Sequence, residues 1–270
     1  MNIFSVFINF IKMIVARRNL IREMVVREIA SQYVGSWLGF IWTIINPLIM
    51  ILIFWFVFGF GLKAQPLKNV PFVVWLTAGM AVWFNFSEIL SGATVMVTNN
   101  PHLVKKILFP CSILPVVKIF SSLVSHIIFL LLLFILIVSY GLPINGWFIL
   151  QGLYYYAAMI VLVMGLAWLT SALNVFIRDT TQIVQVGLQI AFWGTPIFWD
   201  IHIMPPVVQQ ILKLNPVFYL VQGYRDSFIY AVPFWVHWRW SCYYWLVSGA
   251  LLFIGALVFH RLKPHFADVI

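Results

Sequence analysis

The sequence predicts an all-α integral membrane protein, and three observations support this fold class. Hydrophobic residues make up 63% of the chain and charged residues 9%, with a mean hydropathy of +1.01, whereas soluble domains have about 45–50% apolar and about 25% charged residues. The apolar residues fall in blocks of about 20, the length that a helix needs to cross a hydrocarbon core of about 30 Å. The blocks are continuous rather than alternating, which excludes a transmembrane β-barrel and leaves helices.

The first element, residues 17–35, is predicted to be an amphipathic helix at the membrane interface. Apolar side chains recur at helical spacing on one side of it, and charged or polar side chains occupy the other. The apolar side carries Ile21, Met24, Val25, Ile29 and Tyr33, and the polar side carries Arg18, Arg22, Arg27, Glu28 and Gln32. Residues 1–15 are apolar but no small-residue cleavage site follows them, so we expect them to be retained rather than removed as a signal peptide.

Three long apolar stretches follow in the first half of the chain. Residues 37–62 contain no charged residue and form the first predicted span, and residues 70–98, interrupted only by Glu88, form the second. Residues 99–115 are a polar, proline-punctuated loop. The stretch between Lys118 and Arg178 has no charged residue and is too long for one crossing, and turn residues 140–146 divide it into spans 116–139 and 147–176.

The last third of the chain is predicted to cross twice more. Residues 183–199 form the fifth span, but they contain two glycines and Pro196, and prolines recur soon afterwards. Residues 200–238 are therefore expected to form short helices near the membrane surface, before the last span at 241–260. The expected fold is a single transmembrane domain over 1–270 with six transmembrane helices.

The orientation follows from the positions of Lys and Arg, because short cytoplasmic loops are enriched in these residues. With a cytoplasmic N-terminus the inner side holds Lys12, Arg17, Arg18, Arg22, Arg27, Lys105, Lys106, Lys118, Arg178, Arg261 and Lys263, and the outer side Lys63, Lys68, Lys213, Arg225 and Arg239. Both termini are therefore predicted to be cytoplasmic. The net charge of +9 reflects this topology, and we expect no nucleic-acid partner.

The chain shows no motif for catalysis, metal binding or cofactor binding. It has no P-loop, no zinc-type His and Cys spacing, no G-x-S-x-G elbow and no paired carboxylates. Glu88 is the one acid within a predicted span, and a carboxylate in the membrane is costly and therefore a functional candidate. Asn85, Ser87 and Ser91 are near enough in sequence to solvate it, so a structural role and a role in lining a conduit both stay open.

The two loops on the inner side, 99–115 and 174–182, are short. A short connection between long helices transmits a push rather than absorbing it, so these loops are candidate points at which an external energy source acts. They are equally compatible with simple solvated turns.

The order and spacing of several motifs resemble the transmembrane subunit of ABC exporters that move lipid-linked polysaccharides, the Wzm-like O-antigen, teichoic-acid and capsule exporters. The likeness covers about residues 20–260 and is carried by Leu38-Gly39, Trp42, Asn46-Pro47, the loop 102–110 with Leu114-Pro115, Asn174, Arg178-Asp179, Thr195-Pro196-Ile197-Phe198, Leu214-Asn215-Pro216 and Gly223-Tyr224-Arg225. Relatives commonly have a charged residue directly after Phe109-Pro110, where this chain has Cys111-Ser112.

The resemblance implies a transport subunit rather than an enzyme, with residues 1–270 forming a single permease domain. The broken segment near Pro196 to Leu214 would form short re-entrant helices on the periplasmic side, before the last span. Two copies would pair with two copies of a separate ATP-binding subunit, which would hold ATP and Mg, in the bacterial inner membrane, and surrounding membrane lipids would contact the spans. The ATPase would couple through Leu103, Val104, Lys105, Lys106, Phe109, Arg178 and Asp179, beside the interface helix with Arg18, Arg22, Arg27 and Glu28. Candidates for the channel or its periplasmic gate are Glu88, Pro196, Phe198, Trp199, Phe218, Tyr219 and Tyr224.

The substrate implied by the resemblance is a lipid-linked polysaccharide, with O-antigen preferred. A drug or small-molecule efflux permease of the same superfamily is the first alternative. An intramembrane enzyme that modifies a glycan or lipid is the second, but its outer-side candidates Asp200, His202 and Asp226 provide no recognisable constellation. A secondary transporter or channel is the third, although such proteins usually bury several ionisable groups.

Overall fold

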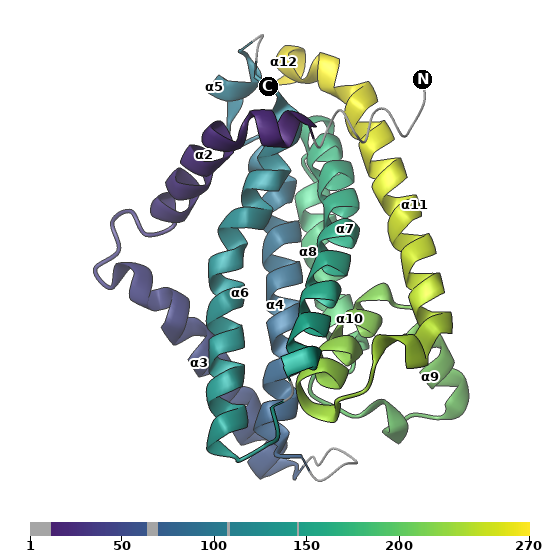
Figure 1. Cartoon of the computed structure of the whole chain (residues 1–270). Helices are drawn as coiled ribbons and strands as arrows, with labels where there is room; N and C mark the ends of the chain where they lie inside the picture. Colours follow the sequence, from purple (N-terminus) through teal and green to yellow (C-terminus); the bar gives the residue numbers. More distant parts are fainter. Residues whose placement is uncertain (1–11, 64–69, 107–108, 145) are drawn as a thin grey trace.

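The computed structural model describes residues 12–63, 70–106, 109–144 and 146–270 (Figure 1). Helix accounts for 83% of it, and no strand occurs in the described ranges. The described ranges leave out residues 107–108 of the predicted loop 99–115 and residue 145 of the predicted turn 140–146. The elements are α2 (Arg18–Ser31), η1 (Gly39–Ile41), α3 (Trp42–Phe54), η2 (Trp55–Gly61), α4 (Phe72–Met96), α5 (Pro101–Val104), η3 (Cys111–Ile113), α6 (Leu114–Ser139), α7 (Gly146–Phe176), α8 (Thr180–Gly194), η4 (Ile201–Ile203), α9 (Pro206–Lys213), α10 (Pro216–Arg225), η5 (Asp226–Tyr230), η6 (Phe234–His237), α11 (Trp238–Leu262), η7 (Lys263–His265) and α12 (Phe266–Val269).

Helix α4 is the centre of the bundle, with α6, α7, α8 and α10 packed around it (Figure 1). Most of its side chains are buried by protein, which explains why it carries polar residues that a lipid-facing helix would exclude. Helix α11 packs along α7 on the other side of the bundle. Gly165 and Gly255 make this contact possible, because a Cβ at Gly255 would lie 2.0 Å from the carbonyl oxygen of Gly165.

The amphipathic helix predicted over 17–35 corresponds to α2. Ile21 is buried and Met24, Val25 and Ile29 are half-buried against the bundle, whereas the three arginines of the predicted polar side are exposed. The chain then turns into α3, and a hydrogen bond between the hydroxyls of Tyr33 and Thr43 joins the two segments. Helix α3 ends in a seven-residue π-helix, η2, a wider winding that no pattern in the sequence predicted.

Five helical stretches are long and apolar enough to cross a membrane: Gly39–Gly61, Phe72–Met96, Cys111–Ser139, Ile149–Phe176 and Phe234–Val269. They cover five of the six predicted crossings. The remaining one, predicted at 183–199, contains α8, which has 15 residues and a length of about 22 Å. Because α8 is shorter than a full hydrocarbon crossing, the count of six stays a prediction.

Beyond α8 the chain makes the short helices that the proline pattern predicted. The side chain of Asn215 accepts a hydrogen bond from the amide of Val217 and so caps α10. Its amide nitrogen donates to the hydroxyl of Thr195, 2.8 Å away, which ties the start of α10 to the end of α8. Helix α10 contacts α4, α7 and α11 and is largely buried. Its re-entry into the membrane stays a prediction.

Two cations that were counted as loop charges lie inside the bundle. Lys118 belongs to the second turn of α6 and Arg225 ends α10, and both are buried. A single cation at the edge of an apolar run looks like a loop charge in sequence, and only packing shows that a partner compensates it.

Candidate functional site

A polar groove runs along one side of the bundle. It has a volume of about 1460 Å³ and is bordered by α2, α3, α4, α6 and α8. Its lining includes amides, hydroxyls and charged groups at positions within predicted spans: Asn46, Ser87, Glu88, Ser91, Lys118, Ser125, Gln185 and Gln189. Gln182, directly before the fifth predicted span, lines it as well. Polar groups at membrane depth are retained where they face protein or a water-filled cavity rather than lipid. The groove is therefore the candidate functional site.

An ion pair between two helices forms one wall of this groove. The Nζ of Lys118 on α6 donates to Oε1 of Glu88 on α4 at 3.1 Å, and the two side chains are 8% and 30% exposed. Gly92, one turn along α4 from Glu88, leaves the space in which the stem of Lys118 lies, since a Cβ there would be 2.3 Å from Cε of the lysine. The pair lowers the cost of holding either charge in the membrane and leaves part of the carboxylate facing the groove.

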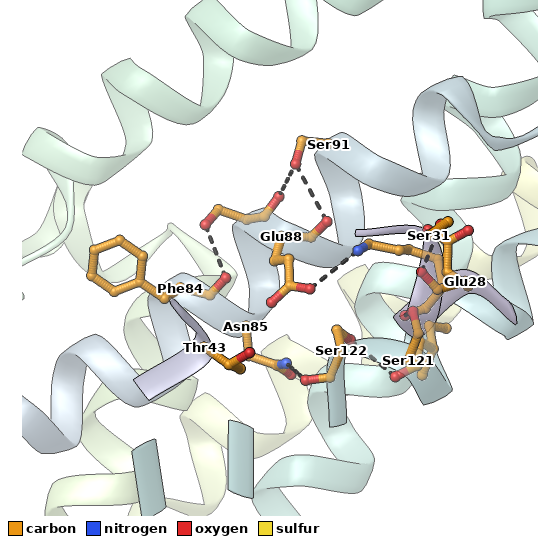
Figure 2. Close-up of polar contacts among 12 residues, drawn as sticks. Glu28, Ser31, Thr43, Phe84, Asn85, Glu88, Ser91, Ser121 and Ser122 are labelled. Carbon is orange, nitrogen blue, oxygen red and sulfur yellow. Dashed lines mark hydrogen bonds and ion pairs between the residues drawn. The ribbon is translucent and has the colours of Figure 1, made fainter. Parts of the chain in front are cut away.

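Hydroxyl and amide groups continue the polar contacts on both sides of Glu88. Figure 2 shows Glu88 and Asn85 projecting from α4 toward α6, which carries Ser121 and Ser122. Asn85 donates to the carbonyl of Ser122 at 2.9 Å, and Ser91 donates to the carbonyls of Ser87 and Glu88. The serines near Glu88 thus satisfy backbone groups, and the partner of the carboxylate is Lys118, which the sequence analysis did not propose.

Helix α8 forms the facing wall and presents a row of amides. Gln182, Gln185 and Gln189 line the groove at spacings of three and four residues, so they project from one face of the helix. The same face continues to Phe192. No motif marked these glutamines in the sequence, although their helical spacing was a usable signal.

Aromatic rings line the groove together with these polar groups. Phe54, Trp83 and Phe192 are among them, and they pack into a cluster with Phe58, Trp193 and Phe198. The ring centroid of Phe198 lies 4.6 Å from that of Phe58 and 5.4 Å from that of Phe192. The groove therefore combines amides and an ion pair with aromatic faces.

The remaining gate candidates are packed into the protein around α10. Phe218, Tyr219 and Tyr224 are buried and do not line the groove. Tyr219 hydrogen-bonds the hydroxyls of Tyr154 and Ser241, Tyr224 hydrogen-bonds Nε2 of His126 at 2.9 Å, and the ring of Phe218 lies against Trp240. Pro196 is buried and Trp199 is half-buried. Their assignment to a channel or gate stays a prediction.

The predicted ATPase-coupling residues lie at the α5 end of the bundle, where α2 also lies (Figure 1). Lys105, Lys106, Arg178 and Asp179 are exposed, whereas Leu103 and Phe109 are half-buried and Val104 is buried. Asn174 connects the two loops, because its side chain bonds Thr98 before α5 and Thr181 at the start of α8.

The acids considered for an enzyme site each contact a histidine. Asp200 lies 2.6 Å from Nδ1 of His202, and Asp226 lies 3.5 Å from Nε2 of His237. The sequence analysis missed the second pair because its partners are eleven positions apart in the chain. Among the described residues, no group of three or more metal-ligating side chains comes together.

These features define a class: a multi-pass, all-helical membrane protein with a polar groove at membrane depth, as a transport subunit requires. The model of the ABC-2 type transporter family matches residues 19–229, and the chain belongs to this family of membrane subunits, which work with an ABC ATPase. Its relatives include the O-antigen export system permease protein RfbA of Klebsiella pneumoniae, 24% identical over 90% of this chain and 92% of the relative.

Two further relatives carry similar descriptions. The O-antigen export system permease protein RfbA of Myxococcus xanthus is 27% identical over 78% of this chain and 80% of the relative's length. The polysialic acid transport protein KpsM of Escherichia coli is 20% identical over 77% of this chain and 80% of the relative's length.

Proposed function

We propose that this chain is the channel-forming subunit of an ABC exporter that moves a lipid-linked polysaccharide, most specifically O-antigen, across the bacterial inner membrane. The observation that carries this proposal is the groove, which is lined by amides, by the Glu88–Lys118 pair and by aromatic rings. Amides and charges exchange hydrogen bonds with sugar hydroxyls, and aromatic faces stack on sugar C–H groups. Relatives described as O-antigen permeases support the choice of substrate.

In the proposed assembly two copies of the chain pair with two ATPase subunits. Helices α3 and α8, which border the groove, carry large exposed apolar side chains such as Ile53 and Ile190. A second copy covering this side would convert two grooves into one enclosed passage. Helix α8 with the segment that follows it would provide the sixth crossing, and α9 and α10 the re-entrant helices.

The proposed orientation places both termini and the α5 end in the cytoplasm. The exposed cations Lys105, Lys106 and Arg178 support this orientation through the positive-inside bias. The ATPase subunits would then contact α5, the turn at Arg178 and Asp179, and α2. ATP and Mg would bind to those subunits, and this chain would contribute no cofactor site or catalytic group.

Deleting the gene separates this proposal from a drug efflux permease. We expect cells without it to lose surface glycan. Because loss of glycan alone changes the outer barrier, their drug sensitivity is compared with that of a second strain that lacks the glycan for another reason. We expect the two strains to be equally sensitive. Complementation with the intact gene restores the glycan. Normal surface glycan together with raised drug sensitivity would reverse the assignment.

A further inference from the structure

The segment after α11 folds back across the α5 end of the bundle. Figure 1 shows α12 beside α5 at this end, and α12 contacts both α5 and α7. The candidate span Phe234–Val269 has 36 residues, many more than the roughly 20 that cross hydrocarbon, so a crossing does not require η7 and α12. The segment thus contacts both α5 and α7. The loop that contains α5 and the turn at Arg178 after α7 were predicted separately to meet an ATPase.

Phe266 anchors this segment. Its side chain is 0% exposed, and its ring centroid lies 5.3 Å from that of Phe259 on α11 and 6.1 Å from that of Phe176 at the end of α7. A fully buried ring with two aromatic neighbours fixes the position of a short helix that has little stability of its own. Helix α12 is therefore held rigidly against the inner ends of α7 and α11.

Apolar and charged side chains are both exposed at this end of the bundle. Phe176, Ile177 and Val269 are 39%, 53% and 50% exposed, and Lys105, Lys106, Arg178 and Asp179 are exposed as well. Exposed apolar side chains that are bordered by charges mark surfaces that a protein partner covers. For an ABC-2 membrane subunit that partner is the ATPase.

We infer that α12 is a contact element of the ATPase docking surface, alongside α5 and the turn at Arg178, and that Phe266 positions it. This inference rests on the proposed function, because it requires an ATPase subunit at this end. It adds a third element which contacts α5 and α7, so that a displacement of the ATPase acts on α11 as well as on α4, α7 and α8.

The test is the affinity of the purified full-length chain, in nanodiscs, for its ATPase subunit. We expect Val269→Glu to weaken binding about tenfold, the scale of a charge placed in the centre of an interface. The matched control is Val236→Glu: Val236 is 56% exposed in η6, at the opposite end of α11, and its substitution leaves the affinity unchanged. Phe266→Ala is expected to weaken binding and Phe266→Leu to restore part of it.

A labelling experiment answers the same question without the disruptive charge. In a Cys242→Ser background, we expect Val269→Cys to react with a water-soluble maleimide in the chain alone and to be protected in the complex. Equal affinity of Val269→Glu and the unaltered chain, together with unprotected labelling, would overturn the inference and leave the proposed function intact. Protection by nanodisc lipid without the ATPase would assign α12 to the membrane surface instead. If the unaltered chain itself does not bind the ATPase, the proposed function fails.

Discussion

The guanidinium carbon of Arg225 lies 3.5 Å from the centroid of the Trp75 indole ring. The same guanidinium donates to the carbonyls of Pro196 and Ile197 at 2.8 Å each, and Gly79 leaves the space for it on α4. Arg225 on α10 therefore connects α4, at the centre of the bundle, to the segment that follows α8. It fixes the backbone next to Phe198, the ring at the centre of the aromatic cluster.

Replacing Arg225 with Leu should loosen this connection. The two carbonyls would lose charge-assisted hydrogen bonds, each worth about 1.5–3 kcal/mol, so we expect a lower melting temperature in detergent and reduced export. Arg225→Lys retains the charge but reaches one carbonyl at most, and its effect should be intermediate. Equal stability of the three proteins in a thermal unfolding series would show that Arg225 does not hold this joint.

The Glu88–Lys118 pair predicts a coupled response. Glu88→Gln and Lys118→Gln each leave one charge in the groove wall without its partner, so each single variant should lose stability and export activity. The double variant should lose less than the sum, with a coupling of about 1–3 kcal/mol. The measurement is a double-mutant cycle of thermal stability with surface glycan as a second readout, and simple additivity of the two effects would contradict the pairing.

The crossing of α7 and α11 depends on the absence of a side chain at Gly255. A Cβ there would meet the carbonyl of Gly165 at 2.0 Å, whereas a Cβ at Gly249 on the same helix meets nothing within 4 Å. Gly255→Ala should therefore destabilise the protein by about 1–3 kcal/mol, as overpacking does. Gly249→Ala is the matched control and should be neutral. If both variants melt at the same temperature, the helices do not cross as the structure has them.

The turn between α7 and α8 predicts a defect in coupling rather than in folding. Arg178 is exposed, so Arg178→Glu should be inserted and folded normally while it lowers the ATPase stimulation and glycan export of the assembled complex. Arg239→Glu places the same exposed charge reversal at the opposite end of the bundle and serves as the control. Unchanged export and ATPase stimulation in a well-expressed Arg178→Glu variant would remove this turn from the coupling surface.

Hydropathy and turn residues were sufficient to predict the helical class, the amphipathic α2 and most of the spanning helices. The boundaries of α4, α6 and α7 lie within two residues of the expected spans at 70–98, 116–139 and 147–176, because long uncharged runs and the turn at 140–146 determine them. The proline pattern likewise predicted that the chain after α8 is broken into short helices.

The site was less accessible to sequence reasoning, because it depends on contacts between distant segments. Glu88 was singled out as the acid within a predicted span, but its partner Lys118, 30 positions along the chain, was counted only as a charge on the inner side. Arg225 was placed outside for the same reason. The π-helical end of α3 and the return of α12 to α5 result from packing, which no periodicity in one chain reports.

The central claim is that this chain is a conduit driven by a separate ATPase, and reconstitution measures it directly. The purified chain is placed in liposomes with its ATPase and a lipid-linked O-polysaccharide, and movement of the glycan across the bilayer is followed with and without ATP. We predict transport only when the chain, the ATPase and hydrolysable ATP are all present. Transport by the chain alone, or a chain that never associates with a nucleotide hydrolase, would contradict the claim.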